Sequence, residues 1–286
     1  MEKKSKFCLY MPPLTTISSY KEMVDYAVAH GISKLETLNI LDLSTPDLDT
    51  AKALRAYADE KGVTIPCVSV GMNLVDDDRD ARIEEMKRYA DVAKILGSPY
   101  LHHTIALNFS EPKKIADNFP YYYTRGLEAV QEIFDYAATL GIRTIYEDQG
   151  FVFNGKETFT RFLQDVGRNV GVVADFGNIQ FVDENVEDFI PAFAERIVHV
   201  HAKDYIITPG NARAIEPGEY TSRGGNYLKG CLIGDGSVHT DAAFRALQAM
   251  GYQGCVALEG DPIGPDEEAS FCKNQQTVTR YMETYL

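Results

Sequence analysis

Four ionisable residues end four successive apolar segments in the second half of the chain. The segments read RTIYE, VVAD, IVHVH and CVALE, and they end at Glu147, Asp175, His201 and Glu259. Side chains alternate between the two faces of a strand, so Glu147, for example, shares a face with Ile145. Charged groups in such surroundings are costly unless they are paired or bind a cation. The four residues are therefore predicted to converge on one site.

Three carboxylates and one imidazole form an oxygen-rich set of metal ligands. Carboxylates that crowd together repel one another, and a divalent cation relieves that repulsion. Carboxylates suit Mg²⁺ or Mn²⁺, and the imidazole shifts the preference towards Mn²⁺, Co²⁺ or Fe²⁺. We expect one divalent metal ion, with Mn²⁺ as first choice and Mg²⁺, Co²⁺, Fe²⁺ or Zn²⁺ as alternatives. One other interpretation stays open, in which some of the four are ordinary strand-end charges that face solvent.

Two residues that closely follow these segments are candidate substrate contacts. Asn178 stands three positions after Asp175 and could bind a substrate hydroxyl, although asparagine after glycine is also common in turns. Lys203 stands two positions after His201. It could clamp the substrate or carry a proton, or it could pair with the neighbouring Asp204.

Earlier apolar segments end in Glu36 and in the pair His102–His103. Because adjacent residues of a strand point to opposite faces, only one of the two histidines can face the pocket. We take His103 as the substrate-binding candidate, with the alternative that a strand-end histidine is simply a hydrogen-bonded neighbour. Glu36 either binds a sugar hydroxyl or orients a loop.

Eight short apolar segments alternate along the chain with eight longer segments of helical periodicity. The predicted strands are 6–11, 33–38, 64–70, 100–106, 143–149, 170–176, 197–203 and 254–260. The predicted helices are 19–30, 47–61, 80–96, 121–140, 157–166, 186–196, 241–250 and 267–285. This count predicts an α/β fold, the (β/α)₈ or TIM barrel. A doubly wound sheet usually carries a glycine-rich phosphate loop after its first strand, where this chain reads MPPLTT.

The pattern favours a single domain over residues 1–286. One long connection, about residues 205–240, follows the seventh predicted strand and is rich in glycine. In a barrel this connection lies on the face where active sites form, and a long loop there is more often a substrate cover than a disordered linker.

The composition is ordinary for a soluble globular protein. The 286 residues carry a formal net charge of −14, which disfavours nucleic-acid backbones as partners. The five cysteines are scattered and do not suggest a disulfide framework or a zinc knuckle. We find neither a signal-peptide core nor an apolar run long enough to span a membrane, so a cytoplasmic location without membrane contact is expected.

Several motifs together resemble one known family. They are Tyr146-Glu147, Asp175-Phe-Gly-Asn178, His199-Val-His201-Ala-Lys203-Asp204, Gly234-Asp-Gly-Ser-Val-His239 and Gly251-Tyr-Gln-Gly followed by Leu258-Glu259. Their order and spacing resemble the xylose isomerase-like TIM barrel superfamily of sugar phosphate isomerases and epimerases, over nearly the whole chain. The resemblance implies that Glu147, Asp175, His201 and Glu259 bind the metal. It also implies that Glu147 and Glu259 exchange the substrate proton, and a homodimer or homotetramer would fit the family.

The expected activity is that of a divalent-metal-dependent isomerase or epimerase. It would act through an enediolate on a small ketose, polyol-derived substrate or sugar acid, either free or phosphorylated. The alternatives are an inosose-type dehydratase on the same site, an endonuclease IV-like hydrolase and a non-catalytic sugar-binding barrel. Two departures from the family pattern bear on this choice. Asn178 replaces a histidine of the endonucleases and ketose epimerases, and Ile207 replaces an arginine of the free-ketose epimerases.

Overall fold

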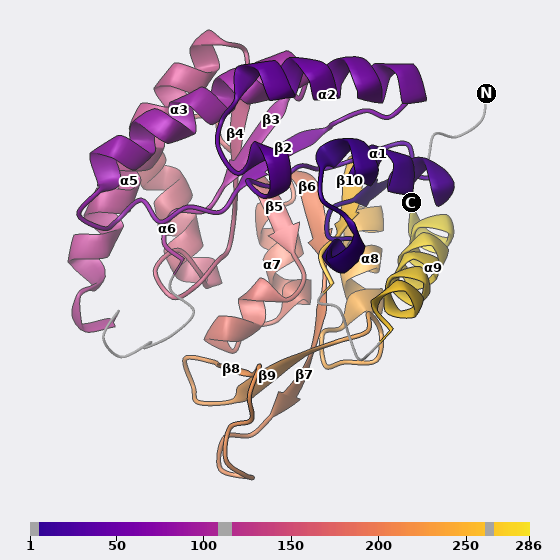
Figure 1. Ribbon diagram of the computed structural model, residues 1–286. Coiled ribbons are helices and arrows are strands. Elements are labelled where there is room, and N and C mark those ends of the chain that lie inside the picture. Colours follow the sequence, from indigo (N-terminus) through magenta and orange to yellow (C-terminus); the bar gives the residue numbers. More distant parts are fainter. Residues whose placement is uncertain (1–5, 108–115, 261–265) are drawn as a thin grey trace.

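The computed structural model describes residues 6–107, 116–260 and 266–286. Its central feature is a curved parallel sheet in the order β1-β10-β6-β5-β4-β3-β2 (Figure 1). These strands are β1 (Phe7–Leu9), β2 (Cys67–Val70), β3 (Tyr100–His103), β4 (Arg143–Glu147), β5 (Gly171–Asp175), β6 (Ile197–Ala202) and β10 (Cys255–Leu258).

The eighth position of the barrel is filled by residues 33–38. This segment forms isolated parallel bridges rather than a continuous strand, and it pairs Leu35 with Leu9 on β1 and Thr37 with Val68 on β2. Backbone hydrogen bonds reach both neighbours, because the Glu36 N–H donates to the Leu9 carbonyl and the Ser69 N–H donates to the Thr37 carbonyl. The segment therefore connects the two edges of the sheet. The predicted (β/α)₈ barrel is confirmed.

Helices surround the sheet (Figure 1). In the described ranges they are α1 (Tyr20–Ala29), α2 (Leu48–Lys61), α3 (Arg79–Leu96), α5 (Phe119–Thr139), α6 (Lys156–Val166), α7 (Val186–Phe193), α8 (Thr240–Ala249) and α9 (Glu267–Tyr285), with short 3₁₀ turns at Leu14–Thr16, Leu41–Leu43 and Asn178–Val182. Helices α2 and α3 end at Gly62 and Gly97, whose positive φ angles suit a left-handed helix end. None of these helices is both long and apolar enough to cross a membrane.

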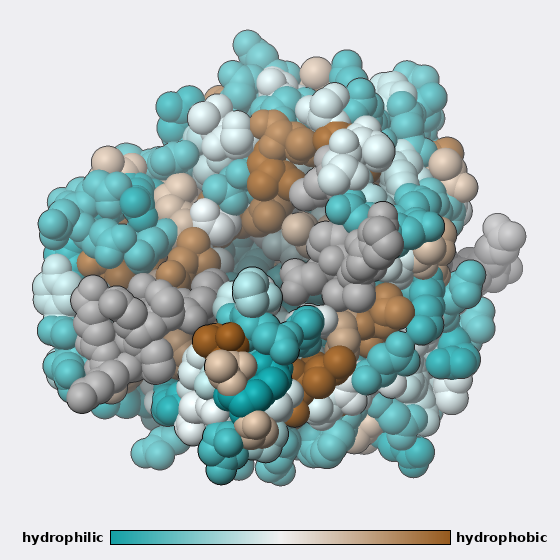
Figure 2. Space-filling model, turned by 60° about the horizontal axis from the view of Figure 1, so that its bottom comes forward, coloured by the Kyte–Doolittle hydropathy of each residue, from teal (hydrophilic) through white to brown (hydrophobic). Residues whose placement is uncertain are grey.

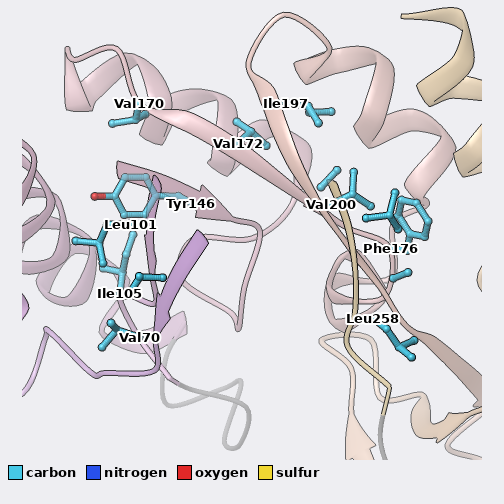
Figure 3. Packing of buried hydrophobic residues seen from close by; sticks show 14 of the residues in the cluster. Val70, Leu101, Ile105, Tyr146, Val170, Val172, Phe176, Ile197, Val200 and Leu258 are labelled. Atoms are coloured by element: carbon cyan, nitrogen blue, oxygen red, sulfur yellow. The ribbon is translucent and has the colours of Figure 1, made fainter. Parts of the chain in front are cut away.

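The alternation of side chains along the strands separates two apolar layers. Tyr146, Val172 and Val200 point outwards and pack under the helices (Figure 3). Ile145 and Val173 point into the barrel, where they cluster with Cys67. Every second residue of a strand lies on the same face. Glu147 and Asp175 stand two positions after Ile145 and Val173, so they also face inwards, at the end of the barrel where β4 and β5 finish.

The long connection after β6 contains its own small antiparallel sheet. Strands β7 (Asp204–Thr208), β8 (Tyr220–Thr221) and β9 (Tyr227–Cys231) pair in the order β7-β9-β8 and extend from the barrel beyond the ends of its strands (Figure 1). Asp204 fixes its base by accepting hydrogen bonds from the backbone N–H groups of Gly234, Gly236 and Val238. The connection follows the strand after which it was predicted, β6, and part of it has regular β structure.

The packing of α6 offers a direct test of this architecture. Phe162 is fully buried and contacts the rings of Tyr146, Phe153 and Phe159. We expect Phe162→Ala to lower the free energy of unfolding by about 3–5 kcal/mol, because it removes a large side chain and leaves a cavity. Urea denaturation measures this change. Tyr121→Ala on α5 is the control, because that ring is 50% exposed and its loss should change stability by about 0.5 kcal/mol or less. Equal effects of the two substitutions would contradict the packing described.

Candidate metal centre and substrate cavity

A cavity of about 260 Å³ lies at the carboxyl ends of the barrel strands. Glu147, Lys203 and Glu259 reach it from the barrel, while Tyr205 and Tyr220 reach it from the small antiparallel sheet. Figure 2 shows a hollow on this side of the molecule, bordered by both hydrophobic and hydrophilic surface. Its position at the strand ends is that of active sites in TIM barrels.

The four predicted metal ligands meet in this region. Each contributes one ligand atom, and these four atoms lie within 4.8 Å of one another. The Nδ1 atom of His201 is central, since it lies 2.9 Å from Glu259 Oε2, 3.3 Å from Glu147 Oε2 and 4.0 Å from Asp175 Oδ2. Asp175 and His201 are fully buried. The structure thus brings together the residues that the sequence had placed on four different strands.

Lys203 lies between two of these carboxylates. Its Nζ atom is 3.0 Å from Asp175 Oδ2 and 2.9 Å from Glu259 Oε1. Burial disfavours the charged amine, but Asp175 and Glu259 outweigh burial, so the pKa of Lys203 lies well above its usual range. In turn Lys203 and His201 overcome burial at Glu259 and hold the pKa of that carboxyl well below its usual range.

Asp175 behaves differently because burial dominates there. Desolvation raises the pKa of Asp175 to about 7, against the opposing influence of Lys203. Its Oδ1 atom accepts hydrogen bonds of 2.8 Å from the backbone N–H groups of Gly177 and Asn178. Its Oδ2 atom and Glu259 Oε2 are buried and accept no hydrogen bond of normal geometry. Lys203 Nζ nevertheless lies close to the first of these oxygens, and His201 Nδ1 lies close to the second.

This donor set fits a divalent metal ion. Two buried carboxylate oxygens have unused lone pairs, and a third carboxylate and an imidazole nitrogen lie beside them. One nitrogen and three oxygens are a suitable set for Mg²⁺, Mn²⁺, Fe²⁺, Co²⁺ or Zn²⁺. Glu147, Asp175, His201 and Glu259 would hold the ion.

Glu36 lies behind His201 and does not line the cavity. It is fully buried, with Oε1 3.0 Å from Nε2 of His201 and Oε2 2.6 Å from Nε2 of His199. The Ser69 hydroxyl donates a further hydrogen bond to Oε1. Both oxygens are therefore used within the protein. This geometry does not suit the expected contact between Glu36 and a sugar, and instead it directs Nδ1 of His201 towards the carboxylates.

The two histidines of β3 point in opposite directions. His103, the expected substrate contact, packs away from the metal ligands, where it accepts a hydrogen bond from the Tyr146 hydroxyl and donates one to the Thr104 carbonyl. Burial lowers its pKa to about 3, so the ring is neutral. His103 does not line the main cavity, whereas His102 does. The cavity lining therefore favours His102 over His103 as the histidine that faces a substrate.

The hydrogen bonds around His102 determine which of its two ring nitrogens carries the proton and which carries the lone pair. Since Ser69 gives its only hydroxyl proton to Glu36, its oxygen accepts the 2.9 Å hydrogen bond from Nδ1 of His102. Nε2 then carries the lone pair. It is buried, has no hydrogen-bond partner and lies 3.8 Å from Glu147 Oε1. Burial lowers the pKa of His102, which favours the neutral ring.

Asn178 and Lys203 both line the cavity, and their contact with a substrate stays a prediction. The side-chain amide nitrogen of Asn178 is buried without a hydrogen-bond partner. Sequence reasoning missed Gln149, whose amide donates a 2.5 Å hydrogen bond to Glu147 Oε1, and Tyr10, whose ring stacks on His201 at 4.9 Å. Gln149 could have been found, because strand alternation places it on the same side as Glu147.

Comparison with known proteins finds similar sequences and similar folds. An inosose dehydratase of Lactiplantibacillus plantarum is 23% identical over 231 residues, which cover 74% of this chain and 73% of the relative. A D-tagatose 3-epimerase-like protein has a similar structure, with a TM-score of 0.74, 17% identity and coverage of 98% of both chains. The IolI protein with a bound zinc atom has a TM-score of 0.74, 19% identity and coverage of 99% of both chains.

A sequence model of one family matches residues 24–275, which is most of the chain. The barrel topology and this match lead to the same assignment. The chain belongs to the xylose isomerase-like TIM barrel family.

Proposed function

We propose that the protein is a metal-dependent sugar isomerase or epimerase that removes a proton from a carbon next to a carbonyl group. The main support is the placement of Glu147 and Glu259 around one cavity. Glu147 ends β4 and Glu259 follows β10, and these strands are separated in the sheet by β5 and β6. The two carboxylates therefore approach a substrate from different directions. One can remove a proton while the other returns it at another face or another carbon.

The proposal includes one divalent ion held by Glu147, Asp175, His201 and Glu259. When bound, such an ion supplies stabilisation of negative charge on the oxygens of an enediolate. Mn²⁺ remains our first choice, with Mg²⁺, Co²⁺, Fe²⁺ and Zn²⁺ as alternatives. The relative with bound zinc supports a metal in this family and leaves its identity in this chain to measurement.

Other residues of the cavity are suited to orient a polyhydroxylated substrate. Nε2 of His102 can accept a hydrogen bond from one hydroxyl, and the amide of Asn178 can donate one to another oxygen. Lys203 keeps Glu259 ionised, which is the form that a general base requires. The rings of Tyr10 and Tyr205 supply apolar surface to the lining of the cavity. The substrate class we propose is a small ketose, polyol-derived compound or sugar acid, free or phosphorylated.

A dehydratase that acts on a keto-inositol is the second candidate. The inosose dehydratase relative supports it, and its first step is the same removal of a proton beside a carbonyl. The two reactions differ afterwards, because the enolate then expels a hydroxyl group instead of regaining a proton. Cytoplasmic location and a homodimeric or homotetrameric state remain predictions.

The first test follows solvent deuterium into candidate substrates. Metal-loaded protein is incubated in D₂O with free ketoses, phosphorylated ketoses and inososes, and products are followed by NMR. Glu147→Gln and Glu259→Gln should each reduce exchange by about 10²–10⁴-fold, because each removes a general base. The metal content of every variant is measured in parallel, so that a lost base can be separated from a lost ion. Glu132→Gln is the control, since Glu132 pairs with Lys87 and neither residue lines the cavity.

The products separate the alternatives. Exchange with an altered stereocentre or a moved carbonyl supports the proposed reaction, whereas loss of water supports the dehydratase. Binding of a sugar without exchange at any metal loading would favour the non-catalytic barrel. Binding of abasic DNA that weakens as salt is raised would favour the hydrolase.

The contact between Glu36 and His201 generates a further prediction. Glu36→Gln should weaken metal binding by about 10–100-fold, because a carboxylate that accepts from a ligating histidine fixes its ring and raises its basicity. Competition with a chelating dye measures the affinity, and Glu132→Gln is again the control. Unchanged affinity in Glu36→Gln would show that His201 does not depend on Glu36 for its orientation.

A further inference from the structure

A second group of metal-ligand side chains lies outside the barrel mouth, where α1 meets α9. His30 follows the last residue of α1, and Glu268 and Cys272 stand one helical turn apart near the start of α9. Their ligand atoms lie within 4.8 Å of one another. We propose that His30, Glu268 and Cys272 form a binding site for a thiophilic divalent cation of the Zn²⁺ type, which links the first and last helices of the described chain.

The hydrogen bonds of His30 leave a nitrogen lone pair facing a carboxylate. Nδ1 lies 2.9 Å from the backbone carbonyl oxygen of Tyr26, which can only accept, so Nδ1 carries the proton. In the neutral ring Nε2 then presents its lone pair to Glu268 Oε1 at 2.9 Å. Two acceptors at this distance repel one another. A cation between them converts the repulsion into coordination, and a proton on Nε2 is the competing solution.

Both ligands are fixed from behind by the same residue. The Tyr26 hydroxyl donates a 2.9 Å hydrogen bond to Glu268 Oε2, so Oε1 is the oxygen directed at His30. The His30 ring stacks on the ring of Tyr26 at 4.1 Å and meets the Phe271 ring edge-on at 5.7 Å. Such outer contacts hold metal-binding histidines in one orientation and one tautomer.

Cys272 completes the set and determines its chemical preference. Its Sγ atom lies 3.7 Å from Glu268 Oε1, and the i, i+4 spacing places both side chains on the same face of α9. Thiolate and imidazole ligands favour Zn²⁺ and Co²⁺ over Mg²⁺ and Ca²⁺.

The proposed site differs from the barrel-mouth centre in both ligands and position. The mouth offers three carboxylates and one imidazole without sulfur, whereas the α1–α9 site offers one of each donor type. Helices α1 and α9 lie next to each other where the chain closes the ring (Figure 1). A bound cation would therefore join α9 to α1 without involving the catalytic carboxylates.

Cobalt absorption distinguishes this site from the mouth, because only a thiolate ligand produces sulfur-to-Co²⁺ charge transfer. The full-length protein is titrated with Co²⁺ and the near-ultraviolet band is recorded. We expect a band that saturates when the α1–α9 site is filled and is abolished by Zn²⁺ competition, while Co²⁺ bound at the mouth contributes no such band. Cys272→Ser should remove the band, and His30→Ala should weaken Co²⁺ binding at least tenfold. Cys255→Ser is the matched control and should retain the band, since Cys255 is another partly exposed cysteine.

Unchanged thermal unfolding of the metal-free variants will show that they fold. Absence of the band in the wild-type protein, or its persistence in Cys272→Ser, would overturn the proposal. The same conclusion would follow if Zn²⁺ raised the unfolding temperature equally in wild type and Cys272→Ser, because His30 and Glu268 would then form a simple ion pair. Neither result would bear on the isomerase or epimerase activity.

Discussion

The mutual repulsion of three carboxylates around the Nδ1 atom of His201 is the constraint on which the rest of the site depends. Glu147, Asp175 and Glu259 converge in a largely buried site, where the described cations beside them are His201 and Lys203. Burial raises the pKa of Asp175 to about 7, and the carboxylates of Glu259 and Glu147 add to that rise. A divalent cation would relieve this repulsion, which is why these residues form a candidate metal site.

The barrel allows this concentration of charge because its strands separate two environments. Inward-facing side chains include the apolar Cys67, Ile145 and Val173, and two residues further along β4 and β5 the carboxylates of Glu147 and Asp175 face the same way. Outward-facing side chains such as Tyr146 and Val172 pack under the helices and fix the position of each strand. A strand shifted by one residue would exchange these faces, so the packing outside the barrel sets the geometry inside it.

Strand alternation made the meeting of Glu147, Asp175, His201 and Glu259 predictable, since each ends an apolar segment and alternation assigns its side chain to one face of the strand. The same rule could not choose between His102 and His103, because it requires knowing which face of β3 is the interior. The partners of Glu36 were also hidden, since His199 and His201 are more than 160 residues away in the sequence. The sheet of β7 to β9 was missed because a glycine-rich composition indicated a loop.

Under the proposed function, the residues that contact the substrate, rather than the candidate metal ligands, decide which reaction takes place. An epimerase and a dehydratase need the same proton-abstracting carboxylate and the same stabilised oxyanion. What separates them is which substrate carbon faces Glu147 or Glu259. His102 and Asn178 offer opposite hydrogen-bonding characters, acceptor and donor, so they can select one orientation of a polyol. Tyr205 and Tyr220 come from the small antiparallel sheet, which makes that sheet the part of the fold best placed to set specificity.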